Sequence, residues 1–149
     1  MALCRHSPHL RLALLWISAL ALVAAPASAG PGAQVASDGL AALSQAAGEI
    51  DELVANAHFR TAVAVAEKTR RWASEIPSSP EVREVRAQIE VLLATAQVAL
   101  GETDGARASL ASALRVWPLL SLDTRSTSPR VVEVFREVRA SAAAARRGP

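Results

Sequence analysis

The sequence predicts an all-α fold of about five helices, forming two antiparallel hairpins plus a capping helix after an N-terminal signal peptide. Two observations predict it. Beyond residue 30, apolar residues recur at three- and four-residue steps, and no stretch alternates between apolar and polar residues. We therefore expect a signal peptide at 1–29, a flexible leader at 30–35, a helical domain at 36–142 and a disordered tail at 143–149.

The first 29 residues have the three parts of an export signal. Arg5 and Arg11 form a basic start, 12–25 is an apolar run, and 26–29 reads Pro-Ala-Ser-Ala, a small-x-small cleavage pattern. An uncleaved anchor is the alternative, but a membrane span takes about 20 apolar residues. We expect cleavage after Ala29, a periplasmic or secreted location, and no stable membrane span in the mature chain.

The cysteine content indicates how the domain is stabilised, and its charge balance limits which partners it can attract. Cys4 is the only cysteine of the chain and lies in the expected signal peptide, so packing alone must hold the mature domain together. Loss of Arg5 and Arg11 leaves 14 of the 16 basic residues against 14 acidic ones. A neutral domain has no overall attraction to nucleic acid, which we do not expect as a partner.

The first two helices are predicted from apolar faces, with Ser37 or Asp38 capping the first and the second ending near Ile76-Pro77. The expected inward residues are Leu40, Leu43, Ala47, Ile50, Val54 and Ala57, then Phe59, Ala62, Val63, Ala66 and Ala73.

The next two helices have clear boundaries. Ser79-Pro80-Glu81 is a strong helix start, since the serine can cap free amides and proline fits the first turn. Gly101 can adopt the left-handed C-cap conformation that ends the third helix. A fourth helix is expected from about 104 to 117, ended by Pro118. The expected inward residues are Val82, Val85, Ile89, Leu92, Leu93, Ala96 and Leu100, then Ala106, Leu110, Ala113 and Leu114.

The C-terminal part predicts one more helix. Residues 119–127 begin with leucines and turn polar, which indicates a segment lying across the core. Ser128-Pro129 then starts the fifth helix, with Val131, Val134, Phe135 and Val138 on its apolar stripe. After Ala140 no apolar stripe remains, and we expect the end to fray.

Residues 90–118 resemble the tetratricopeptide repeat. The matching positions are Leu93, Ala94, Gly101, Ala106, Ala113, Leu114 and Pro118. Small residues at such positions let two antiparallel helices approach closely. The family's usual Trp, Tyr and Phe are replaced here by Glu90, Gln97 and Leu110. The resemblance implies one recognisable and one degenerate hairpin, a closing helix, and the binding of a protein or peptide partner.

No arrangement of residues indicates an enzyme, a metal site or a cofactor. His58 is the only histidine of the mature chain and has no cysteine beside it. The adjacent pair Asp51 and Glu52 points apart on a helix, while Glu133 and Glu137 lie on an exposed face beside arginines. An enzyme would need a carboxylate pocket that the sequence does not reveal.

Two pairings of arginine with tryptophan are candidate partner-binding sites. Arg70 and Arg71 adjoin Trp72, and Arg115 lies close to Trp117, so cation-π contacts could hold a carboxylate-bearing peptide. Tryptophans near helix ends also seal small cores, which is the alternative.

The sequence predicts two alternative functions. The first is an exported, non-enzymatic adaptor that binds a protein or peptide in the cell envelope. The second is an alanine-rich structural protein that forms homo-oligomers, because Leu43, Ile50 and Ala57 lie at the seven-residue steps of a coiled-coil seam.

Overall fold

The computed structural model describes residues 31–148, and within this range the chain is all-helical. The helices are α1 (Pro31–Ala55), α2 (Phe59–Ala73), α3 (Pro80–Leu100), α4 (Thr103–Val116) and α5 (Pro129–Arg147). The described residues contain no β-strand. The predicted fold class of five helices is confirmed, whereas the signal peptide at 1–29 lies outside the described residues.

Local chemistry sets the ends of α3 as predicted. The Ser79 hydroxyl oxygen accepts a hydrogen bond from the Val82 amide at 3.2 Å, and Pro80 occupies the first turn. Gly101 has φ of 83°, a left-handed conformation that glycine adopts without a steric penalty. Both boundaries of the third predicted helix are therefore confirmed.

Other helix ends differ from the predictions. α1 begins at Pro31, so Ser37 and Asp38 lie inside the helix and the leader residues 31–35 are helical. α5 continues to Arg147, through most of the tail expected to be disordered. Proline suits a first helical turn and alanine has the highest helix propensity, which accounts for both extensions. Ala57, expected to face inward, is exposed in the turn after α1 with φ of 60°.

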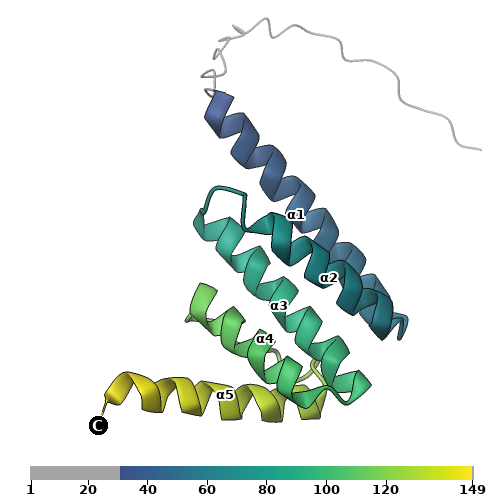
Figure 1. Ribbon diagram of the computed structural model, residues 1–149, viewed down its shortest axis with the longest axis vertical. Helices are drawn as coiled ribbons and strands as arrows, with labels where there is room; N and C mark the ends of the chain where they lie inside the picture. Colours follow the sequence, from purple (N-terminus) through teal and green to yellow (C-terminus); the bar gives the residue numbers. More distant parts are fainter. Residues whose placement is uncertain (1–30, 149) are drawn as a thin grey trace, which may run out of the picture.

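α2, α3 and α4 each run antiparallel to the preceding helix, whereas α5 runs in the same general direction as α4 (Figure 1). α1 and α2 form one hairpin, α3 and α4 form a second, and α5 packs on α4 and α3. α3 also packs against α1 and α2, which makes it the central helix. α1 and α5 consequently lie at opposite edges of the described domain.

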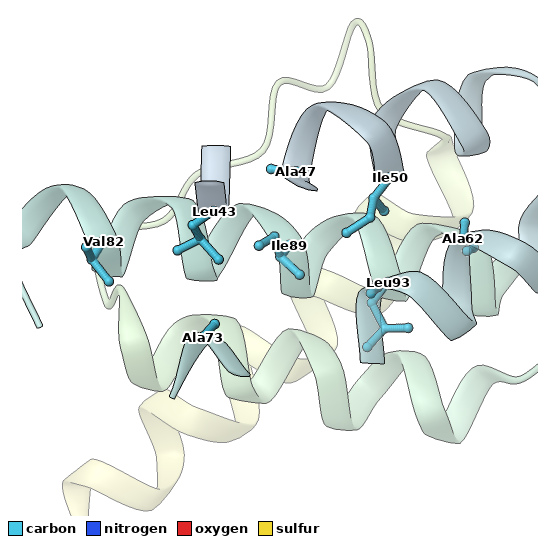
Figure 2. Close-up of a cluster of buried hydrophobic side chains, with 10 residues drawn as sticks. Leu43, Ala47, Ile50, Ala62, Ala73, Val82, Ile89 and Leu93 are labelled. Atoms are coloured by element: carbon cyan, nitrogen blue, oxygen red, sulfur yellow. The ribbon is translucent and has the colours of Figure 1, made fainter. Parts of the chain in front are cut away.

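Two clusters of buried side chains form the core, one on each side of α3. Figure 2 shows the first, where side chains of α1, α2 and α3 meet. The second joins α3, α4 and α5. The first contains Leu43, Ala47, Ile50, Ala62, Ala66, Ala73, Val82, Ile89, Leu93 and Ala96, and the second contains Ala94, Val98, Ala106, Leu110, Leu114, Val131, Val134 and Phe135.

The segment between α4 and α5 covers the second cluster only in part. Leu120 and Leu122 pack against that cluster, as expected for a segment lying across the core. Leu119, in contrast, is 83% exposed. Val132, which was not on the predicted stripe of the fifth helix, is buried.

The proposed coiled-coil seam on the first helix is wrong. Leu43 and Ile50 are fully buried inside the first core cluster, and Ala57 lies beyond the end of α1. These side chains pack within one copy of the domain, so they offer no surface for a second copy.

Close packing of α3 and α4 generates a stability prediction. Ala106 has no exposed surface and belongs to the second core cluster. We expect Ala106→Trp to lower the free energy of unfolding by at least about 1–3 kcal/mol, since a well-packed core has no room for an indole. Thermal melts followed by circular dichroism measure the effect. Ala99→Trp, at an exposed position of α3, is the matched control and should leave the melting temperature nearly unchanged. Equal melting temperatures for both variants would contradict the packing described here.

Candidate functional site

The five predicted partner-binding residues do not form one site. Arg70, Arg71 and Trp72 lie near the end of α2, where Trp72 packs against the first core cluster. Trp117 follows α4 and lines a different hollow, together with Leu119 and Leu120. In the sequence, Arg70 and Arg115 lie close to different tryptophans. In the structure, the charges of both arginines lower the pKa of one buried carboxylate.

That carboxylate belongs to Glu90, in the middle of α3. The residue is 5% exposed. The Ser112 hydroxyl of α4 donates a hydrogen bond to its Oε1 atom at 3.1 Å, and Nη1 of Arg70 on α2 lies 3.8 Å from Oε2. Burial raises the pKa of Glu90, and the Arg70 charge, the Ser112 hydrogen bond and the Arg115 charge oppose this shift. Glu90 therefore links three helices.

A small cavity of about 180 Å³ lies beside this carboxylate. Arg86 lines it and donates hydrogen bonds through Nη2 to the carbonyl oxygens of Ala73 and Ile76, the second at 2.7 Å. Ala73 is the last residue of α2 and Ile76 lies in the turn after it, so Arg86 connects the end of α2 and this turn to α3. Arg86 Nε and Glu90 Oε2 are enclosed and have no hydrogen-bond partner among the described residues. The polar contacts of Arg86 and Glu90 are therefore with α2, the turn after it and α4.

A second polar contact follows Glu90 along the same helix. Gln97, one heptad later, is buried, and its Oε1 accepts a hydrogen bond from the Ser109 hydroxyl at 3.0 Å. Sequence reasoning treated Glu90 and Gln97 only as departures from a repeat pattern. Glu90 and Gln97 are seven residues apart on α3, and the two serines that contact them are three residues apart on α4. This spacing is the sequence signal that could have indicated a row of buried polar contacts between the two helices.

A groove of about 840 Å³ lies between α4 and α5. Figure 1 shows the two helices diverging toward their carboxyl ends. We call this hollow the α4/α5 groove. Its lining residues are mostly small or apolar: Arg107, Ala108, Ala111, Leu114, Arg115, Pro118, Glu137, Val138, Ser141, Ala142, Ala145 and Arg146.

The charges of the α4/α5 groove are unequal. Arg107 bonds to both Glu137 and Asp104 at 3.1 Å, and these hydrogen bonds raise its pKa. Arg115 and Arg146, in contrast, form no ion pair with any residue that the structure describes. The groove thus has an apolar, alanine-rich lining and two arginines, Arg115 and Arg146, that form no ion pair with the described residues, although the Arg115 charge also influences Glu90.

The lining of the α4/α5 groove has two properties that could accommodate another helix. Alanine side chains allow a second helix axis to approach within about 8–10 Å. Free guanidinium groups bind carboxylates with charge-assisted hydrogen bonds. In residues 31–148, no group of three or more His, Cys, Asp and Glu side chains is placed to hold a metal ion. None of the helices that the structure describes is long and apolar enough to cross a membrane.

The burial of Glu90 predicts a stability that depends on pH. Because folding raises the pKa of Glu90, the folded protein binds this proton more tightly than the unfolded chain. The resulting stabilisation is present in acid and is lost as the pH rises through the raised pKa. Glu90→Gln removes the buried charge at similar size, so we expect it to melt at a higher temperature than the native protein at about pH 8, by an amount that shrinks toward about pH 4.

Thermal melts across this pH range measure the effect. Glu84→Gln, which removes an exposed carboxylate from the same helix, is the matched control and should not change the pH profile in this way. A Glu90→Gln variant less stable than the native protein at pH 8 would show that the Arg70 and Ser112 contacts outweigh the cost of burial.

The comparisons with known proteins identify no relative. No family model matches the chain, and neither the curated proteins nor the solved structures yielded a match. The resemblance to tetratricopeptide repeats stays a prediction from residues 90–118, and a proposal about function depends on the geometry of the domain itself.

Proposed function

We propose that this chain is an exported, non-enzymatic adaptor that binds a partner protein of the cell envelope. The partner contributes an amphipathic helix with acidic residues, which binds in the α4/α5 groove. The unpaired Arg115 and Arg146 beside an alanine-rich lining are the observation that carries this proposal.

The size and shape of the α4/α5 groove support a helical ligand. The groove has a volume of about 840 Å³. It runs along α4 from Arg107 to Arg115 and along α5 from Glu137 to Arg146, about 12–14 Å at 1.5 Å per residue. Two or three turns of a helix fit that length.

The cavity beside Glu90 is a weaker candidate. It has about 180 Å³, and Oε2 of Glu90 is enclosed. A general acid or base must reach the proton that it transfers. The hydrogen bond from Ser112 and the ion pair with Arg70 instead support a structural role, and this geometry favours an adaptor over an enzyme.

Export is the second component of the proposal. It is supported by the tripartite pattern of residues 1–29. Helical domains of stacked hairpins suit the binding of extended or helical peptides, which agrees with an envelope adaptor.

Site-specific photo-crosslinking tests the α4/α5 groove. A photo-reactive amino acid replaces Ala108 or Ala145, both exposed residues that line the groove, in the full-length chain expressed in its own cells. We expect a discrete crosslinked product at both positions. Mass spectrometry of that product should identify an acidic helical segment, because the free arginines select for carboxylates.

Matched variants make this experiment decisive. The same photo-reactive residue at Ala64 of α2 or Ala99 of α3, both exposed and outside the groove, should give no such product. Arg146→Glu should remove the product, while Arg136→Glu, an equal charge change on another face of α5, should not. Equal crosslinking at all four alanines would sink the adaptor proposal.

A further inference from the structure

α1 carries an exposed acidic face that nothing in the described domain covers. Between Pro31 and Ala55 the helix has four acidic residues and no basic residue. Asp38, Glu49 and Glu52 are exposed and form no ion pair with the described residues. At 100° per residue they project from the side opposite the buried Leu43 and Ile50.

The same face of α1 is rich in small residues. Ala41, Ala42 and Gly48 are exposed and lie between the carboxylates along the helix. The stretch from Asp38 to Glu52 is about 21 Å long at 1.5 Å per residue. We call it the α1 acidic face: a helix surface of small residues and carboxylates, long enough to span the α4/α5 groove.

The α4/α5 groove has the complementary properties. Its lining includes Ala108, Ala111, Ala142 and Ala145, and the unpaired charges at its open end are guanidinium groups. α5 as a whole has five arginines and two glutamates. The chain thus contains, at one edge, the kind of helix that the groove at its other edge would bind.

We infer that α1 of a second copy of this chain occupies the α4/α5 groove, through contacts of its acidic face with Arg115 and Arg146. This inference rests on the proposed role of the groove as a helix-binding site. Charge complementarity supplies the specificity, and small residues on both sides allow close approach of the helices.

The placement of the two surfaces determines the form of the assembly. α1 and α5 lie at opposite edges of the domain (Figure 1), so a copy bound through its groove still has its own α1 acidic face free. Such a contact is heterologous and continues from copy to copy. Copies therefore assemble head to tail, and the last copy keeps an open groove for a different partner.

Sedimentation equilibrium of the purified protein, made from the full chain with its amino terminus verified by mass spectrometry, tests the assembly. The mean mass should rise with concentration beyond that of two copies and fall again in about 1 M salt, where the Debye length shrinks to about 3 Å. A single monomeric mass at every concentration, or a dimer that grows no further, would overturn the inference.

Charge reversal identifies the two surfaces. Glu49→Arg on α1 and Arg146→Glu in the groove should each weaken association by at least about tenfold, because like charges then meet. The double variant with both changes should recover association. Asp51→Arg and Arg136→Glu, exposed charges on other faces of α1 and α5, are the matched controls and should associate like the native protein. Circular dichroism confirms that each variant is folded. A double variant as weak as the two single ones would refute the pairing of α1 with the groove.

The crosslinking variants separate this inference from the adaptor proposal. With the photo-reactive residue at Ala108 or Ala145, the purified protein should form a product of two copies whose crosslink maps to α1. If the purified protein gives none, while cells give a groove-specific product with a different protein, the adaptor proposal stands and the self-assembly inference fails. If no groove-specific product forms in either setting, both fail.

Discussion

The structure depends on one constraint, the burial of α3 on two opposite sides. Its side chains enter both core clusters, so α1 and α2 pack on one flank while α4 and α5 pack on the other. A helix enclosed in this way needs small residues where neighbours come close, and Ala87, Ala94 and Ala96 are fully buried. It also has little surface left for solvating polar groups. Glu90 and Gln97 consequently face other helices, and Ser112 and Ser109 of α4 supply their hydrogen bonds.

The edges of the domain follow from the same architecture. α1 and α5 each have neighbours on one side, so each keeps an exposed face. On α3, Ala87, Ala94 and Ala96 are covered by packed helices, whereas Ala142 and Ala145 of α5 line an open groove. Alanine therefore has two roles in this chain. It permits close packing inside the domain, and at the α4/α5 groove it leaves space for another helix.

The parts of the fold that could be predicted are those determined within a few residues. Ser79, Pro80 and Gly101 set the ends of α3 by local hydrogen bonding and backbone conformation, and apolar spacing identified most of the core. The polar contacts around Glu90 could not be predicted in this way. Arg70 and Arg115 were chosen for their proximity in sequence to tryptophans, but adjacent residues on a helix project about 100° apart. The contact of Arg70 with Glu90 depends on how α2 packs against α3, which no local pattern encodes.

The α4/α5 groove was missed for a related reason. Its shape depends on the angle at which α5 leaves α4, and that angle is set by how Val131, Val134 and Phe135 pack against Ala106 and Leu110. The apolar stripe of α5 predicts which side faces inward, but it does not reveal that α5 diverges from α4 toward its carboxyl end (Figure 1).

The charge balance of the chain shows why totals can hide an interaction. Without Arg5 and Arg11, which belong to the predicted signal peptide, the 14 remaining basic residues equal the 14 acidic ones, and this sum predicts no electrostatic partner. The structure places these charges unevenly: α1 has four carboxylates and no cation, while α5 has three more arginines than glutamates. A neutral molecule with opposite charges at its two edges repels other copies weakly in most orientations and attracts them in the head-to-tail one. Neutrality of residues 30–149 is thus compatible with ordered self-association, because such an interaction depends on where each charge lies along the array of helices.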